Sequence, residues 1–137
     1  MIKPLNPKGQ LMDRQERLKN LAEEFGECSK ALAAIGDETR QSIIIALIEG
    51  ESDCEKGIRV GELTQRTNLS RPAVSHHLKV LKEANLIGFD QEGTKNYYYL
   101  DVLKSDIFRL KRLFDHIDEF IKDSAESDPK TINDDEG

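Results

Sequence analysis

The chain of 137 residues has no tryptophan, four prolines and only two cysteines, Cys28 and Cys54. One pair of cysteines is too few for a disulfide framework, and we expect both thiols to be reduced. No apolar run approaches the roughly 18 residues that a membrane-spanning helix needs, and the first residues lack the apolar segment of a secretory signal. The composition therefore predicts a soluble, cytoplasmic protein without a membrane partner.

Charge is unevenly distributed along the chain. The formal net charge is -6, which argues against nucleic-acid binding over the whole surface, because phosphates attract lysine and arginine. Residues 56–97 differ, since their seven basic and four acidic side chains make this block net positive. A local surface for DNA therefore remains compatible with an acidic chain.

The length suits one domain, which we place at residues 13–122. Residues 1–12 contain two prolines and Gly9 and are expected to form a flexible N-terminus. Residues 123–137 are acidic, lack aromatic side chains and contain Pro129, which is typical of a disordered tail. The simplest role of this tail is to keep the chain soluble.

Two segments repeat apolar residues at alternating spacings of three and four, which is the pattern of a helix with an apolar seam. The first covers residues 18–35 and the second residues 103–121. Between them, Asp37 is the expected N-cap of a short buried helix that ends at Gly50. The chain is thus predicted to be mainly helical.

Residues 60–82 predict two helices that meet at a tight corner. The first ends near Asn68, and Ser70 is placed to cap the second, which has Pro72 in its first turn. This is the helix-turn-helix arrangement, whose second helix lies in the major groove of DNA. Two aromatic and β-branched runs at residues 86–89 and 96–100 predict a following hairpin, which makes the arrangement winged.

The second helix carries a polar face suited to DNA. Small and polar side chains near its start let the backbone approach base edges, and Arg71 can donate two parallel hydrogen bonds to guanine. Gly93 allows a tight wing tip at residues 91–95, which would bring Lys95 to the DNA backbone or minor groove. His77 falls on the packed face and is expected to be a core histidine. The predicted DNA-binding residues are Ser70, Arg71, Pro72, Ser75, His76, Lys79, Lys82 and Lys95.

Several motifs together resemble the ArsR/SmtB family of bacterial winged-helix repressors over roughly residues 18–121. They are Asp37-Glu38-Thr39-Arg40, Val60-Gly61-Glu62-Leu63, Leu69-Ser70-Arg71-Pro72-Ala73-Val74-Ser75-His76-His77-Leu78-Lys79-Val80-Leu81, Glu92-Gly93-Thr94-Lys95 and Tyr97-Tyr98. The resemblance implies a winged helix-turn-helix regulator that represses transcription at a palindromic operator in double-stranded DNA. It also implies a homodimer formed by the first and last helices, which agrees with the two seams. The predicted interface residues are Leu18, Leu21, Phe25, Cys28, Leu110, Phe114, Ile117 and Ile121.

Family members often release DNA when a metal binds, so candidate ligands matter. The thiolate site that some members carry would fall near residues 59–61, where there is no cysteine. In the last helix, His116 and Glu119 match the late pair of the family's zinc site, whereas the early pair is reduced to Asp106. Because zinc normally needs four ligands, we predict no cofactor, although zinc or another divalent metal stays an open alternative. No cation adjoins Cys28 or Cys54, which disfavours redox sensing, and the inducer is not predicted.

The second candidate function is a winged-helix adapter that binds proteins without specific DNA binding. The net positive block at residues 56–97 argues against the adapter, whereas the acidic tail would suit it. An enzyme is not predicted, because the sequence has no phosphate-cradling glycine motif, no nucleophile paired with a base and no complete catalytic metal cluster.

Overall fold

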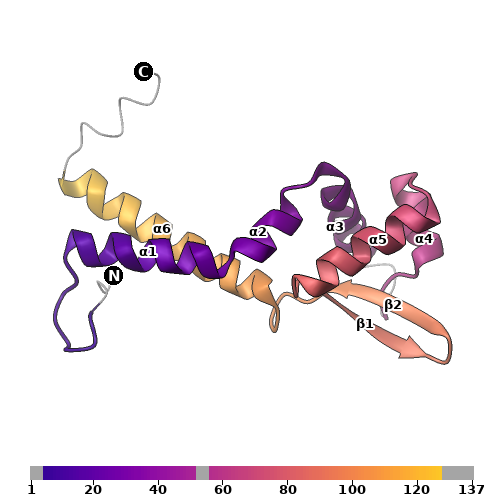
Figure 1. Cartoon of the computed structure of the whole chain (residues 1–137), viewed down its shortest axis with the longest axis horizontal. Helices are drawn as coiled ribbons and strands as arrows, with labels where there is room; N and C mark the ends of the chain where they lie inside the picture. The colour runs from indigo at the N-terminus through magenta and orange to yellow at the C-terminus, as the bar shows by residue number, and fades with distance from the viewer. Residues whose placement is uncertain (1–4, 52–55, 128–137) are drawn as a thin grey trace, which may run out of the picture. The chain divides into compact units, whose positions relative to one another are not determined.

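A computed structural model describes residues 5–51 and 56–127. In chain order the elements are α1 (Arg14–Glu27), α2 (Ser29–Ile35), α3 (Glu38–Gly50), α4 (Val60–Thr67), α5 (Arg71–Glu83), β1 (Ile87–Glu92), β2 (Lys95–Leu100) and α6 (Asp106–Ser127), as Figure 1 shows. The part of the chain that the structure describes divides into a central unit, within residues 28–110, and a terminal unit formed by the segments before residue 28 and after residue 110. No helix in the described part is long and apolar enough to cross a membrane.

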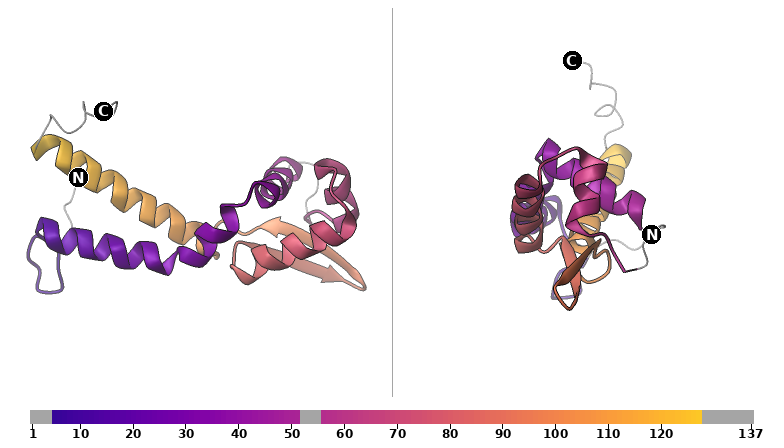
Figure 2. Two further views of the ribbon diagram at one scale, coloured as in Figure 1. Left: turned by 45° about the horizontal axis from the view of Figure 1, so that its top comes forward. Right: turned by 90° about the vertical axis from the view of Figure 1, so that its right-hand side faces the viewer.

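The central unit holds most of the buried apolar side chains. Helices α2 to α5 contribute Ala31, Ala34, Ile43, Leu47, Leu63, Val74, Leu78 and Leu81 to this core, and the segments before α4 and β1 add Ile58 and Leu86. Each fully buried leucine, isoleucine or valine stabilises the fold by about 1.5–3 kcal/mol relative to an exposed one. Figure 2 shows the hairpin running alongside α5, which fixes the position of both elements.

The predicted starts of α3 and α5 and the predicted end of α4 are confirmed. The side chain of Asp37 accepts a hydrogen bond from the backbone N–H of Arg40 at 2.9 Å, and that of Ser70 accepts one from Ala73 at 3.2 Å. Asn68 adopts a left-handed conformation with φ of 59° and ends α4. The two helices therefore meet at a corner that local sequence specifies.

The hairpin of β1 and β2, hereafter the wing, is antiparallel and pairs Ile87 with Leu100 at one end and Glu92 with Lys95 at the other. Gly93, with φ of +62°, lies in the turn between the two strands. Both strands are longer than the sequence predicted. The backbone of Ile58 also pairs with Tyr98 through two hydrogen bonds of 2.8 Å, which the sequence did not predict.

Gly57 permits this extra pairing. Its φ is +111°, and a Cβ atom there would lie 2.6 Å from the carbonyl oxygen of Tyr98. Only glycine tolerates both the conformation and the close approach. The loop that leads into α4 is thereby joined to the wing.

The two long predicted helices differ from those in the structure. The first is interrupted at Cys28, whose φ of -93° and ψ of 3° separate α1 from α2. The second begins later, because the buried Ser105 hydroxyl accepts from the backbone N–H of Ile107 at 3.1 Å, which leaves Leu103 in an exposed turn. Helix α6 then continues past residue 122 to Ser127. The rest of the predicted tail, residues 128–137, and Cys54 lie outside the described residues.

The first twelve residues were expected to be flexible. Within their described part, Leu5 pairs with Leu11, and the side chain of Asn6 accepts from the backbone N–H groups of Lys8 and Gln10, each at 3.0 Å. A turn therefore precedes α1.

A pair of hydrogen bonds joins the end of α5 to the start of α6. The backbone N–H of Asp106 donates to the carbonyl of Asn85 at 2.9 Å, and the Asn85 amide donates to the Asp106 carboxylate at 3.2 Å. Asn85 has a φ of 59°, which turns the chain sharply after α5. The metal candidate Asp106 thus has a structural role at this joint.

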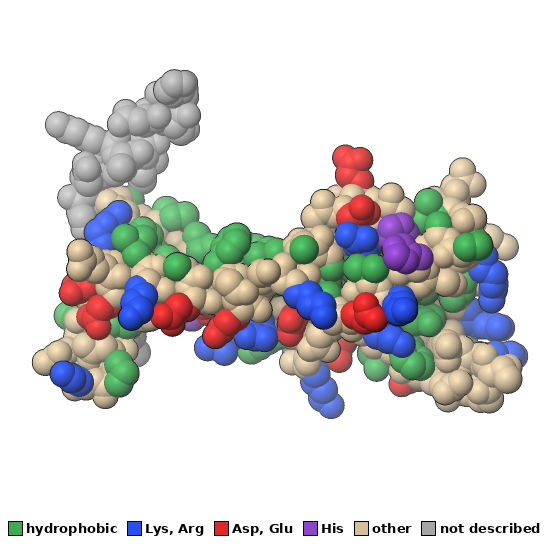
Figure 3. Space-filling model, in the orientation of Figure 1, with side chains coloured by type: hydrophobic (Ala, Val, Ile, Leu, Met, Phe, Trp, Pro, Cys, Tyr) green, Lys and Arg blue, Asp and Glu red, His purple; other side chains and the backbone are tan. Residues whose placement is uncertain are grey.

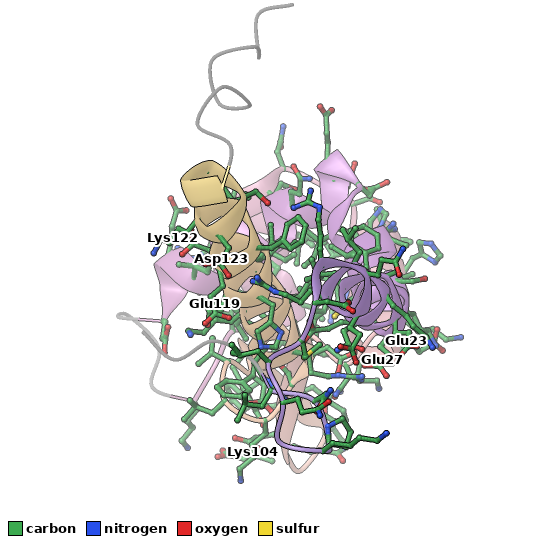
Figure 4. All side chains as sticks on the ribbon, turned by 90° about the vertical axis from the view of Figure 1, so that its left-hand side faces the viewer. Glu23, Glu27, Lys104, Glu119, Lys122 and Asp123 are labelled. Atoms are coloured by element: carbon green, nitrogen blue, oxygen red, sulfur yellow. The ribbon has the colours of Figure 1, made fainter. Side chains whose placement is uncertain are left out.

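The terminal unit contains α1 and most of α6, and polar side chains connect them. Arg14 donates to Ser124 at 3.0 Å, Arg17 pairs with Asp123, and Figure 4 shows Asp123 on α6. None of the residues of α1, all of which the structure describes, is buried. The two helices therefore enclose little core within one chain.

Candidate nucleic-acid interface

Helix α5 presents the predicted polar face to solvent. Its opposite face is anchored, since Val74 and Leu81 are 0% exposed and Leu78 is 2% exposed. The side chains that the sequence assigned to DNA are exposed, and seven of them lie on α5 or at its N-cap, namely Ser70, Arg71, Pro72, Ser75, His76, Lys79 and Lys82. The structure thus brings these residues together on one accessible surface.

The other predicted contact, Lys95, begins β2 and is exposed at the wing tip. Lys82 connects α5 to the wing, because its ammonium nitrogen lies 4.6 Å from the centre of the Phe89 ring. A cation over an aromatic ring is stabilised by the ring's electrons. Lys82 therefore lies where helix and wing meet.

His77 is half-buried, whereas the sequence placed it in the core. Its Nδ1 lies 3.4 Å from the guanidinium of Arg40, and its ring meets that of His76 edge-on at 5.2 Å. Burial lowers the pKa of His77, although the carboxylate of Asp37 opposes this effect. The pKa of Asp37 is lowered chiefly by the hydrogen bond from the Arg40 backbone. His77 therefore helps to hold α5 against α3.

Arg71 leans toward the first turn of α4. A Cβ atom on Gly61 would lie 3.9 Å from a terminal nitrogen of the Arg71 guanidinium, so the guanidinium lies beside the first turn of α4. Lys56 and Arg59, in the segment before α4, are also exposed. Figure 3 shows Lys and Arg side chains gathered at the end of the central unit that carries α4 and the wing. Sequence reasoning missed these two cations because their segment has no periodicity, although both belong to the net positive block.

The candidate metal ligands are arranged differently from the prediction. His116 Nδ1 lies 2.8 and 2.9 Å from the two carboxylate oxygens of Glu24, which the sequence did not single out. Figure 4 shows Glu119 on α6. Among residues 5–51 and 56–127, no group of three or more histidine, cysteine, aspartate or glutamate side chains is placed to hold a metal ion. His116 joins α6 to α1 in the terminal unit.

The predicted interface residues divide into two groups. Leu18 is 45% exposed, and Phe25, Phe114 and Ile121 are each 54% exposed, so these four are available to a partner. Leu21 and Ile117 are half-buried. Cys28 and Leu110 are 2% and 6% exposed because they pack inside their own chain, and their part in a dimer interface stays a prediction.

A helix-turn-helix with an exposed polar second helix, followed by a hairpin, defines a winged-helix DNA-binding protein. Comparison with known proteins agrees. The sequence model described as "Bacterial regulatory protein, arsR family" matches residues 37–88.

Three curated relatives extend the match. An HTH-type transcriptional regulator of Mycobacterium tuberculosis is 40% identical over 85 residues, which are 58% of this chain and 74% of the relative. The transcriptional activator HlyU of Vibrio cholerae is 33% identical over 109 residues, covering 78% and 92%. The arsenical resistance operon repressor of Bacillus subtilis is 33% identical over 86 residues, covering 63% and 74%.

Among solved structures, an ArsR-like transcriptional regulator from Rhodococcus sp. RHA1 has the same fold, with a TM-score of 0.63 at 22% identity over 83% of this chain and 96% of that one. The chain belongs to the ArsR family of bacterial regulatory proteins. It is a DNA-binding transcriptional regulator and not an enzyme.

Proposed function

We propose that this regulator is a homodimeric repressor that reads a palindromic operator by placing α5 in the major groove. The exposed polar face of α5, held in place by its buried opposite face, is the observation that carries the proposal. Half-sites about one helical turn apart would match the two recognition helices of a dimer.

The side chains of this face have separate roles. Arg71 has the forked geometry that guanine edges accept, and Ser75 and His76 lie where they can bond base edges or phosphate. Lys79 and Lys82 follow at the later turns and bind phosphates, as does Lys95 from the wing. Ser70 and Pro72 keep the start of the helix small enough for close approach to the bases.

Helix α1 needs a partner surface, which favours a dimer. An isolated helix of its 14 residues is marginal in water, and most helical stability in proteins comes from packing an apolar face. Leu18 and Phe25 leave that face exposed, as do Phe114 and Ile121 on α6. A second copy of the chain would cover these side chains and set the spacing between the two recognition helices.

Occupancy of a promoter by the dimer would block transcription. The relative from B. subtilis is a repressor and the one from V. cholerae an activator, so the fold alone does not decide the direction of regulation. The protein would act in the cytoplasm, where bacterial DNA is. An inducer can act only by binding one dimer shape more tightly than another.

Selection from a random-sequence duplex pool tests the proposal. The purified full-length chain is used at about physiological salt, first with chelator and then with zinc, because affinity depends on salt. We expect an enriched inverted repeat. Zinc-dependent loss would restore the metal hypothesis for His116 and Glu119, whereas no enrichment under either condition would favour the protein-binding adapter.

The selected duplex then tests the assigned roles. Arg71→Ala should relax base preference, whereas Lys79→Ala should weaken all sequences equally and lower the salt slope. Uniform loss of affinity in both variants would contradict the division between base and phosphate contacts.

A further inference from the structure

A wide cleft of about 690 Å³ lies beside the start of α5. Its walls come from the segment before α4, the first two turns of α4, the first residue of α5 and the wing strand β2. Lys56, Arg59, Gln65, Arg71 and Tyr97 line it. Three of these five side chains are cations, and they come from different parts of the central unit.

The walls are fixed by backbone contacts. The two hydrogen bonds between Ile58 and Tyr98 hold the segment before α4 against β2, and Gly57 allows the close approach. Arg59 follows directly as the extended N-cap of α4, with φ of -84° and ψ of 157°, and its side chain makes no capping hydrogen bond.

The charges in the cleft favour an anion. Glu62 is the carboxylate that lines it, and Arg66 already donates to Glu62 at 2.8 Å. Lys56 pairs with Glu92 of the wing at 2.9 Å, and both side chains are well exposed. Within the described residues, Arg59 and Arg71 have no ion-pair partner. Positive charge in the cleft is therefore only partly neutralised.

We propose that this cleft seats a backbone phosphate of the DNA that flanks the half-site read by α5. Arg59 supplies the charge that contacts the phosphate, while Lys56, Gln65 and Tyr97 supply further donors. The assignment rests on the proposed function. DNA is the partner because the cleft is open, is continuous with α5 through Arg71, and lies in the one net positive block of an acidic chain. In helix-turn-helix proteins the helix before the recognition helix crosses the DNA backbone, which is the position of α4.

Arg59→Gln is the first test, with Lys30→Gln as the matched control on the exposed surface of α2. Both variants lose one positive charge, but Lys30 does not line the cleft. With two clefts per dimer, Arg59→Gln should lower the slope of log affinity against log salt by about 2, and should weaken binding to every duplex roughly tenfold or more. The control should change neither quantity appreciably.

Glu92→Gln tests the cleft in the opposite direction. Removing the carboxylate frees Lys56 for phosphate, so affinity should rise a few-fold on all duplexes, an outcome that misfolding cannot produce. When Lys56→Gln is already present, adding Glu92→Gln should give no gain in affinity. This double-mutant cycle isolates the interaction between the two residues. An equal gain with and without Lys56 would mean that Glu92 repels DNA directly, and would remove Lys56 from the cleft assignment.

The selected duplex also locates the contact. Neutral methylphosphonate linkages are introduced into the duplex one at a time. At a flanking position the wild type should bind the modified duplex more weakly than the unmodified one, whereas Arg59→Gln should bind both equally. If the wild type binds DNA and Arg59→Gln matches Lys30→Gln at every position, the cleft assignment is wrong and the proposed function stands. If the wild type shows no salt-dependent duplex binding, the proposed function itself fails.

Discussion

Replacing Gly57 with alanine should uncouple the wing from the helix-turn-helix. The added Cβ atom would lie 2.6 Å from the Tyr98 carbonyl oxygen, which is backbone and cannot rotate away. Relief requires the segment at residues 57 and 58 to move off β2, which breaks the two hydrogen bonds between Ile58 and Tyr98. Ile58 is 1% exposed, so its movement also disturbs the core.

The expected cost can be added from separate contributions. A side chain at φ of +111° is strained by about 1–3 kcal/mol, and each lost backbone hydrogen bond costs about 1 kcal/mol. The reduced freedom of the unfolded chain returns about 0.4–1 kcal/mol. The free energy of unfolding should therefore fall by about 3 kcal/mol, a large part of the 5–15 kcal/mol that is usual for a domain.

Gly93→Ala is the matched control, because Gly93 also has a positive φ, +62°, but no heavy atom lies within 4 Å of a Cβ placed there. Its cost should be about 1 kcal/mol. Urea unfolding followed by circular dichroism, at equal protein concentration for both variants, should give a midpoint lower by about 1 M or more for Gly57→Ala than for Gly93→Ala. Equal midpoints would refute the steric argument.

Three further predictions concern the dimer, the cap and pH. Phe114→Asp should raise the dimer dissociation constant, measured by sedimentation, more than about 100-fold. Each dimer would lose two apolar contacts, each of about 1.5–3 kcal/mol. Unchanged sedimentation would place the interface elsewhere. Ser70→Ala should lower the free energy of unfolding, measured in urea, by about 1 kcal/mol. Ser70→Asp should keep the cap but weaken DNA binding in titrations. Equal stability of the two variants would contradict the capping role of Ser70. Folding lowers the pKa of His77 from 6.5, so its contribution to stability is present above pH 6.5 and is lost as pH falls below that value. Between about pH 7.5 and about pH 5.5, His77→Gln should therefore lose less free energy of unfolding than the wild type. Equal losses for the two proteins in urea unfolding would contradict this expectation.

Local signals were sufficient to predict the helix-turn-helix and the turn of the wing. Asp37 and Ser70 act through hydrogen bonds to N–H groups three residues away, and Asn68 and Gly93 supply left-handed conformations at the turns. Such interactions are encoded within a few residues, so their pattern is visible in the sequence. The exposed face of α5 followed from its helical periodicity alone.

Contacts between distant segments could not be predicted in this way. The seam through Cys28 has unbroken spacing, and the interruption of the helix there coincides with burial of that side chain by the rest of the chain. The pairing of Ile58 with Tyr98 joins residues 40 positions apart, and the contact of Glu24 with His116 joins residues 92 positions apart. No pattern in a single sequence identifies such partners. The cleft beside α5 depends on the first of these pairings and was missed for that reason.

The joint between Asn85 and Asp106 has a mechanical consequence. Two hydrogen bonds hold Asp106, the first residue of α6, against Asn85, which lies two residues beyond the end of α5, so a movement at the start of α6 acts on the chain directly after α5. Both partners of this joint belong to the central unit. A ligand that displaced the first residues of α6 would therefore disturb the end of α5 without touching the exposed polar face of that helix.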